Sequence, residues 1–507
     1  MEEEVRMSRR VHIELSRVQT WLFAMPRLRA MVGANALLGE TLRVALPKLA
    51  RDTGRGWMLA PINEAYPCAD ERDPLQYYDD PAADAKAGIL SRDGGHFEAQ
   101  FASGAEAFSQ AAGRLLRSNL PGLRFRVCLD GQPPDESRVH LSTELPVLAP
   151  CEWTGRGLAS AIVEQGDEHL AVSLDVAQRH EAAKNTENGT AVDVASLLSE
   201  TTKLKTLKRV QELKELVGDG YLALIHADGN GVGVGSGAGK TDSERAAFFH
   251  RNRVLLRRAV QKAIDTHCPD TGRAPLIPLM LGGDDLLLVT RAELALPFVV
   301  TLCGELDALQ KSSTGFKLTL GVGVVFAKHT IPVHRLHQVV EQLASSAKRR
   351  FRGFKDEDAK RSVVDWAVFS SAWVDDSEEV RRRHWLRGGG NELRVLSQRP
   401  VDVLGDGRLD SLQGLVRGAQ QLACAPRSQL RYLVDQLSRG RALSELAFAE
   451  LPQEARGPLA EAGVKEPWRR VGNASITALL DLIEITEIGR LGRNTERADN
   501  EREAAHV

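Results

Sequence analysis

The chain has 507 residues, of which 43% are hydrophobic and 26% are charged, and its formal net charge at pH 7 is −2. This hydrophobic content is sufficient for sizeable cores, and the length is typical of roughly three or four domains. The near-zero net charge argues against a basic protein that coats nucleic acid, so any RNA contact must come from local patches or from partner chains. The 6 cysteines form no Cys-x-x-Cys pair, which argues against both a zinc knuckle and a disulfide framework.

Residues 9–132 are expected to form a first domain, with strands and helices in the ferredoxin-like order β-α-β-β-α-β. The strand-like segments are residues 10–15, 56–62, 87–91 and 123–129, and the helical ones are residues 18–49 and 105–118. This domain lacks the acidic turn that occurs in a similar domain further along the chain. We therefore expect it to be inert.

Residues 133–216 follow as a linking domain, which we expect to be mostly helical. Its last part, residues 201–216, has the periodicity of an amphipathic helix with a basic face. The basic side chains are Lys203, Lys205, Lys208, Arg209 and Lys214. We favour a solvated face on a helix that packs against the next domain, and guidance of RNA or of a triphosphate is the alternative.

Residues 217–370 predict a second domain with the same order of elements. A strand at residues 221–227 ends in Asp228 and leads into a glycine-rich loop. Thr241 and Glu244 fit a capping box, which marks the start of a helix over residues 245–264. The later segments are strands at residues 276–281 and 286–289, a helix at residues 292–310, a strand at residues 317–327 and a helix at residues 333–350. This order is ferredoxin-like, with one further helix at the end.

Two adjacent aspartates, Asp284 and Asp285, follow Gly282 and Gly283 between two apolar strands. The pattern predicts a buried β-hairpin with both carboxylates at its tip. Neighbouring carboxylates repel each other unless a cation lies between them, and hard oxygen ligands favour Mg²⁺ or Mn²⁺. A solvated tip without a ligand is the alternative.

The predicted topology places the strand that ends at Asp228 beside the two strands of this hairpin. We therefore expect Asp228 to approach Asp284 and Asp285. Three converging carboxylates are the arrangement of a metal-dependent nucleotidyl-transfer site, in which two Mg²⁺ or Mn²⁺ ions activate a ribose hydroxyl and hold a nucleoside triphosphate.

The sequences Ala-Asp-Gly-Asn-Gly-Val-Gly at residues 227–233 and Leu-Gly-Gly-Asp-Asp at residues 281–285 resemble the paired motifs of a known family. That family is the large palm-domain (GGDD) subunit of type III CRISPR effector complexes, of the Cas10/Cmr2 type, and a more distant similarity is to GGDEF-type cyclases. Weaker similarities cover the start of the family's first, non-catalytic palm and its closing helical domain. The resemblance implies an α+β fold with two ferredoxin-like palm domains, one catalytic and one inert, plus helical domains.

The resemblance implies synthesis of cyclic oligoadenylate second messengers from ATP in antiviral defence. It also implies guide and target RNA and sister effector subunits as partners. On this basis Asp228, Asp284 and Asp285 are expected to be the catalytic and metal-binding residues. The residues expected to bind the nucleotide are Gly229, Asn230, Gly231, Gly282, Gly283 and Lys348.

Two departures from the family pattern matter. Asn230 stands where the family often has a second acidic residue, which reduces the charge available to a second metal ion. No His-Asp dipeptide occurs in the sequence, so we expect no HD nuclease domain. Two alternatives stay open: a catalytically weak scaffold subunit that binds guide RNA and sister subunits, or a standalone GGDEF-like cyclase that makes a cyclic dinucleotide.

The remaining residues predict a charged linker at residues 371–400 and a helical bundle at residues 401–507, whose polar end from residue 494 is expected to fray. No secretory signal or apolar run of about 18 residues is present. We therefore expect a cytoplasmic protein that has no contact with a membrane.

Overall fold

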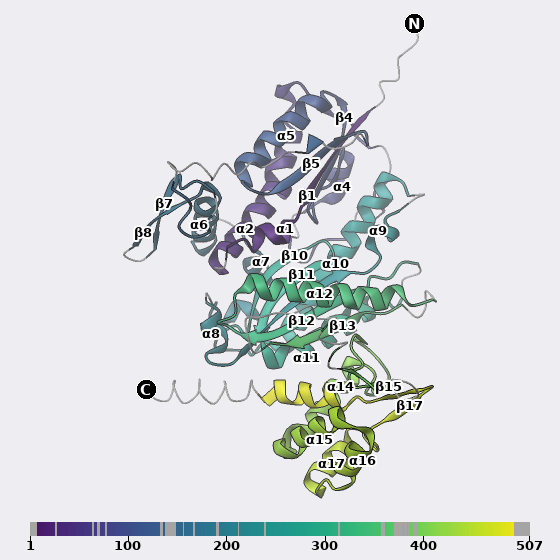
Figure 1. Cartoon of the computed structure of the whole chain (residues 1–507). Coiled ribbons are helices and arrows are strands. Elements are labelled where there is room, and N and C mark those ends of the chain that lie inside the picture. Colours follow the sequence, from purple (N-terminus) through teal and green to yellow (C-terminus); the bar gives the residue numbers. More distant parts are fainter. Residues whose placement is uncertain are drawn as a thin grey trace. The chain divides into compact units, whose positions relative to one another are not determined.

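The computed structural model describes residues 8–490 with several gaps, which are residues 26–27, 63–64, 68–70, 77–78, 132–134, 137–148, 156, 166–167, 189–191, 211, 238–239, 313–314, 356–359, 370–378, 380–382, 384 and 389–392. The chain divides into two compact units. The first consists of Met1–Lys205, Gly231–Arg258 and Pro278–Asp285, and the second of Thr206–Asn230, Ala259–Ile277 and Leu286–Val507. Helices and sheets are mixed throughout, which confirms the predicted α+β class (Figure 1).

The first unit is built on an antiparallel sheet. Its main strands are β1 (Arg9–Ser16), β2 (Met58–Leu59), β3 (Ile89–Ser91), β4 (His96–Ser103) and β5 (Arg124–Leu129). The central strand β1 pairs antiparallel with both β4 and β5. Alternate side chains of β1 are buried, as expected for a strand that covers a core on one face. Phe108 of helix α5 (Ala105–Asn119) packs on this core, with its ring centroid 4.5 Å from that of Phe101.

The single helix predicted over residues 18–49 is wrong, because the structure has several shorter helices there. These are α1 (Val18–Leu22), α2 (Leu28–Glu40), a π-helical turn (Thr41–Ala45) and α3 (Leu46–Ala50). The amide of Phe23 donates to the carbonyl of Gln19 at the end of α1. The sequence then contains Pro26, which lacks the amide hydrogen that a continuous helix requires. Strand β4 is absent from the prediction, since its Glu, Gln and Ala residues have low strand propensity.

The linking domain was expected to be mostly helical, and its described residues contain helices together with a β-hairpin that was not predicted. Besides α6 (Leu174–Glu187) and α7 (Val194–Thr201), the region contains a β-hairpin of β7 (Ala161–Gln165) and β8 (Glu168–Val172). The hairpin forms because Val163 and Val172 bury their side chains in a small apolar cluster that also contains Cys151.

The basic helix predicted over residues 201–216 is replaced by two short helical segments, Lys203–Thr206 and α8 (Leu213–Val217). Between them Lys208 is extended. Its amide donates to the carbonyl of Gly272 at 2.8 Å, and its carbonyl accepts from the amide of Ala274 at 3.0 Å. This tertiary pairing outweighs the local helical pattern.

The order predicted for the second domain is confirmed from β9 to α12. The elements are β9 (Tyr221–Gly229), α9 (Val232–Gly235), α10 (Asp242–His267), β10 (Leu276–Gly282), β11 (Asp285–Arg291), α11 (Ala292–Leu309), β12 (Leu320–Lys328) and α12 (Val333–Arg352). The capping box is present, since the amide of Thr241 donates to Glu244 Oε2 at 2.8 Å and the amide of Glu244 donates to Thr241 Oγ1 at 3.2 Å. The first part of α10 belongs to the first compact unit and its second part to the second.

The sheet of this domain has the strand order β10-β11-β9-β12-β13-β16. Strand β9 pairs antiparallel with β11 and with β12. Two strands were not predicted, namely β13 (Val363–Val368), parallel to β12, and β16 (Val401–Asp402). Helix α12 packs closely on β12 at Gly323, where an added Cβ would lie 2.3 Å from the carbonyl oxygen of Val340. A glycine is therefore required for this approach.

The C-terminal part is mainly helical, as predicted, but it also contains a small sheet. The helices are α14 (Leu412–Gln421), α15 (Arg427–Arg439), α16 (Arg441–Ala449), α17 (Gln453–Glu461) and a helical stretch at residues 479–490. The strands are β14 (Leu386–Arg387), β15 (Leu393–Val395), β17 (Arg469–Val471) and β18 (Ala474–Ile476). The predicted fraying of residues 494–507 lies outside the described residues.

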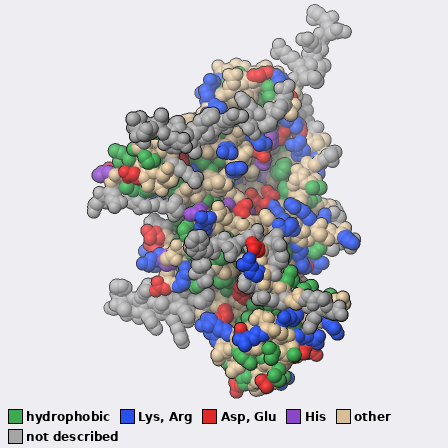
Figure 2. Space-filling view, in the orientation of Figure 1, with side chains coloured by type: hydrophobic (Ala, Val, Ile, Leu, Met, Phe, Trp, Pro, Cys, Tyr) green, Lys and Arg blue, Asp and Glu red, His purple; other side chains and the backbone are tan. Residues whose placement is uncertain are grey.

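Buried ionic and aromatic contacts fasten this part to the sheet. The Arg399 guanidinium lies 4.6 Å from the ring centroid of Trp366 and 4.2 Å from that of Trp385. It also pairs with Asp481 at 2.9 Å. Hydrophobic side chains remain exposed over the C-terminal helices (Figure 2). Leu446, for example, is 55% exposed. Within the described part of the chain, no helix combines the length and the hydrophobicity that crossing a membrane requires.

Candidate active site

Strand β9 carries Asp228 to the end of a buried run. Residues 222–227 are all buried, whereas the side chain of Asp228 is 30% exposed. In the register of the sheet Asp228 lies opposite Gly321 of β12. The apolar residues thus fix the strand in the core, and the carboxylate emerges where the strand reaches the surface.

Lys348 of α12 lies against Asp228. Its Nζ donates a hydrogen bond to Asp228 Oδ2, and the two side chains are 23% and 30% exposed. A partly exposed ion pair of this kind can exchange one partner for another at modest cost. Lys348, which we predicted to contact the nucleotide, is therefore placed beside the first predicted carboxylate.

Asn230 brings an amide oxygen into the same group. Its backbone amide donates to the carbonyl of Thr319 at 2.8 Å, and its Nδ2 donates to Thr319 Oγ1 at 3.2 Å. The residue is 2% exposed, and its Oδ1 has no hydrogen-bond partner among the described residues. A buried acceptor without a donor is costly, and a cation would satisfy it.

Gly321 leaves the space in which these side chains meet. An added Cβ at this position would lie 2.7 Å from Lys348 Cγ and 3.0 Å from Asn230 Oδ1. Neither Gly321 nor Thr319 was predicted as a site residue. Residues 320–324 read as an ordinary apolar strand, so the sequence offers no signal of this role.

The acidic turn (residues 282–285) joins β10 to β11. Gly283 has φ +37°, a conformation that favours glycine, and Gly282 has open space around its Cα. Asp284 and Asp285 are each partly exposed. In β11 the next residue, Leu286, pairs with Ala227 of β9. Asp285 directly precedes Leu286, and Asp228 directly follows Ala227. The two aspartates therefore flank the same pair of residues in the antiparallel strands.

The donor set is suited to a hard cation, since it consists of carboxylate and amide oxygens. Outside the gaps given above, no three His, Cys, Asp or Glu side chains are gathered in a way that could hold a metal ion. A magnesium ion in a nucleotide site, however, takes only one or two carboxylates and completes its shell with phosphate oxygens and water. The oxygen atoms of these residues would suit such an ion.

His226 is buried in β9, two residues before Asp228, and is 4% exposed. Burial lowers the pKa of His226 to about 4, with a smaller opposing contribution from Asp228. Its Nδ1 lies 3.2 Å from Glu341 Oε1. The imidazole is therefore neutral at physiological pH and is packed in the core.

We predict that Gly321→Ala impairs the site and also lowers the stability of the fold. The new methyl group would press on Lys348 and Asn230, which we expect to lower activity about 10-fold at a stability cost of about 1–3 kcal/mol. The measurements are catalytic activity and the midpoint of thermal unfolding. Gly304→Ala, on a helix in the same unit, is the matched control, since its added Cβ meets only Leu404 Cδ2 at 3.9 Å. Equal losses in both variants would contradict the prediction.

Comparisons with known proteins identify a family for one part of the chain. Residues 221–357 match the family described as Cas10/Cmr2, second palm domain. No curated protein matches the chain. Among solved structures, the apo Csm1-Csm4 cassette and the same cassette in complex with cA4 each have 12% sequence identity and a TM-score of 0.44, covering 96% of this chain and 70% of that chain. The Csm1-Csm4 subcomplex of the type III-A CRISPR-Csm interference complex has 12% identity and a TM-score of 0.42. The match covers 95% of this chain and 70% of the chain in that structure.

Proposed function

We propose that this chain, whose residues 221–357 are a second palm domain of the Cas10/Cmr2 family, is a nucleotidyltransferase that joins ATP molecules into cyclic oligoadenylate. The observation that carries the proposal is the placement of acidic residues on adjacent strands. Asp228 follows Ala227 of β9, and Asp285 precedes Leu286 of β11, its partner in the sheet. Adjacent strands are roughly 5 Å apart, so this register suits carboxylates that share a cation.

Asp228, Asp284 and Asp285 are the residues that would hold two Mg²⁺ or Mn²⁺ ions, and Asn230 would add its amide oxygen. Bound there, such ions would lower the pKa of a ribose hydroxyl and neutralise charge on the triphosphate. The chain's own contribution is to present oxygen ligands on rigid strands and to leave room for the nucleotide at Gly229, Gly231, Gly282 and Gly283. Gly282 suits this role because its surroundings are open.

In the proposed reaction the hydroxyl oxygen of one ATP forms a bond to the α-phosphorus of another, and the bond to pyrophosphate breaks. The hydroxyl proton passes to water. His226 does not accept this proton, because its imidazole is buried in the core. Lys348 would exchange its hydrogen bond with Asp228 for one with the triphosphate of the incoming nucleotide. This exchange would release Asp228 for the cation when substrate arrives.

We predict that Lys348→Met raises the KM for ATP. Loss of a charge-assisted hydrogen bond costs about 1.5–3 kcal/mol, which corresponds to a rise in KM for ATP of about 10-fold or more. The measurement is initial rate against ATP concentration. Arg352→Met removes a charge from an exposed position of the same helix and serves as control. If Lys348 acted only as a lock on Asp228, its removal would lower KM instead.

The test of the proposal is to incubate the purified chain with labelled ATP and Mn²⁺ and to identify the products by mass spectrometry. Cyclic oligoadenylates together with pyrophosphate are the expected result. A cyclic dinucleotide would favour the GGDEF-like alternative. Complete absence of product, also after addition of sister subunits and target RNA, would favour a scaffold subunit, for which Asn230 in place of a second acidic residue is the supporting feature.

We further propose that guide and target RNA and sister effector subunits are the partners of the chain, and that it acts in the cytoplasm. The similar solved structures are Csm1-Csm4 assemblies. A net charge of −2 suits recruitment of RNA through such partners rather than through the chain as a whole. Co-purification of the chain with sister subunits and RNA, compared with the chain alone, tests this assembly.

A further inference from the structure

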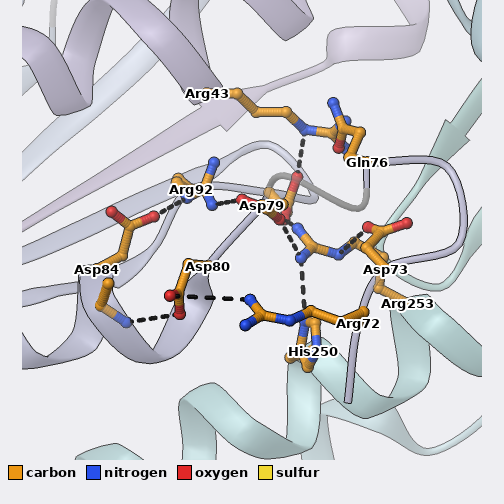
Figure 3. A network of polar contacts seen from close by, with 12 residues as sticks. Arg43, Arg72, Asp73, Gln76, Asp79, Asp80, Asp84, Arg92, His250 and Arg253 are labelled. Atoms are coloured by element: carbon orange, nitrogen blue, oxygen red, sulfur yellow. Dashed lines mark hydrogen bonds and ion pairs between the residues drawn. The ribbon is translucent and has the colours of Figure 1, made fainter. Parts of the chain in front are cut away.

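A buried ionic network in the first unit connects helix α10 to a loop of the first palm-like domain. The anchor loop (residues 71–80, with 77–78 outside the described residues) supplies carboxylates, and α10 supplies arginines. Arg253 lies at its centre, with only 4% of its side chain exposed. Figure 3 shows its guanidinium between Asp73 and Asp79, with His250 beside it.

Arg253 contacts three carboxylates at once. Its Nε lies 3.2 Å from Asp73 Oδ2, its Nη2 donates to Asp79 Oδ2 at 2.6 Å, and its Nη1 donates to Asp93 Oδ2. Burial lowers the pKa of Arg253 to about 9, so the guanidinium stays charged at neutral pH. Burial alone would raise the pKa of Asp73, but the guanidinium groups of Arg257 and Arg253 lower it to about 2. Arg253 and Asp73 are therefore both ionised at neutral pH.

Asp93 connects this network to the turn between β3 and β4. It belongs to the turn between β3 and β4, and its carbonyl accepts from the amide of His96 at 3.0 Å. A second arginine, Arg43, donates from Nε to Asp93 Oδ1 at 2.6 Å. The preceding residue, Arg92, is held as well, since its Nε lies 2.6 Å from Asp84 Oδ2. The turn of the first palm-like domain is thus fixed from both sides.

The next residue, Gly94, lies close to the acidic turn. A Cβ added to Gly283 would be 3.8 Å from Gly94 Cα, and both residues are in the first compact unit. Gly94 has φ +63°, so the close approach is made by backbone in a conformation that favours glycine. Arg253 thus holds Asp93, and Gly94, which follows Asp93, is a close neighbour of Gly283, the residue before Asp284.

We propose that Arg253 is a positioning residue for the acidic turn, which it holds in place through Asp93 and Gly94. The proposal rests on the proposed function in one respect, namely that the acidic turn is catalytic. Arginine is required because its planar group can hold several carboxylates in fixed directions, whereas lysine offers a single ammonium group. Loss of this support would let the turn shift, and a small displacement of catalytic groups has a large effect on rate.

Arg257 provides a matched control one turn further along α10. It is also buried, and its Nη1 donates to Asp73 and, at 3.1 Å, to Gln76 Oε1. Within the described residues Arg257 forms no hydrogen bond or ion pair with Asp93, so the two arginines differ in their connection to the turn. Arg257→Lys should disturb the same network without moving Gly94.

The experiment compares Arg253→Lys, Asp93→Asn and Arg257→Lys with the unaltered chain. Hydrogen–deuterium exchange of peptides that cover residues 278–286 reports the order of the turn independently of catalysis, and initial rates report its use. We expect faster exchange in Arg253→Lys and Asp93→Asn, with the rate at saturating ATP lower by about 10-fold or more and KM changed by less than about 3-fold. Arg257→Lys should leave both the exchange and the saturated rate near those of the unaltered chain.

Unchanged exchange of the turn in Asp93→Asn would overturn the proposal, and so would an equal effect of Arg257→Lys. Asp93→Asn keeps the shape of the side chain and therefore keeps the test decisive if Arg253→Lys folds poorly. If the unaltered chain makes no product from ATP but the exchange pattern is as expected, the proposed function fails and the positioning of the turn stands. If product forms but the expected exchange pattern is absent, the proposed function stands and the positioning role of Arg253 fails.

Discussion

Replacement of Asp284 and Asp285 together by asparagine is expected to abolish nucleotide product while leaving the fold intact. Asparagine keeps the size of the side chains and removes both charges, so the acidic turn loses its attraction for cations and for a metal-bound triphosphate. Removal of preorganised electrostatic groups typically costs about 10²–10³-fold in rate for a single group, and we expect a larger loss for the pair. Mass spectrometry of the products formed from ATP measures the effect.

The control for this variant is its own stability. Two neighbouring carboxylates repel each other when no cation is bound, so the thermal midpoint should be unchanged or slightly higher without added metal. The single variants Asp284→Asn and Asp285→Asn should each lose activity in part. Product formation at the rate of the unaltered chain in the double variant would show that the turn has no catalytic role.

Replacement of Asp228 by asparagine is the second change with a large expected effect. It removes the carboxylate contributed by β9 and also breaks the hydrogen bond that Lys348 Nζ donates to it. We expect a loss of activity of about 10²-fold or more. Because the pair is partly exposed, stability should fall by no more than about 1 kcal/mol.

A double-mutant cycle distinguishes catalysis by Asp228 from a structural role of the ion pair. If the pair only stabilised the domain, Asp228→Asn combined with Lys348→Met would be no worse than either change alone. If Asp228 serves catalysis, Lys348→Met cannot rescue the loss. Recovery of activity in the double variant would contradict the catalytic assignment of Asp228.

Much of the second domain could be predicted from the sequence because its local patterns are strong. The continuous apolar run before Asp228 and the two apolar strands around the acidic turn leave few alternatives to buried strands. The capping box marked by Thr241 predicted the start of α10 closely. The same patterns gave the candidate carboxylates, since charged residues at the ends of buried strands stand out.

The failures arise where tertiary contacts decide the structure. Residues 201–216 have a helical pattern, yet Lys208 pairs with the chain around Gly272, a contact across more than 60 residues that no local pattern reveals. The space left by Gly321 is recognisable only once α12 lies on β12. The contact of Arg253 with Asp93 likewise joins residues 160 positions apart, so its connection to the acidic turn was not accessible from sequence.

The central claim is that carboxylates from β9 and from the acidic turn bind the same divalent cations over a nucleoside triphosphate. Electron paramagnetic resonance of Mn²⁺, titrated into the chain with a non-hydrolysable ATP analogue, measures this directly. We predict that Asp228→Asn and Asp284→Asn each lower Mn²⁺ affinity by about 10-fold or more, while Mn²⁺ binds the unaltered chain tightly only when the analogue is present. Affinity in Asp228→Asn equal to that of the unaltered chain would contradict the claim.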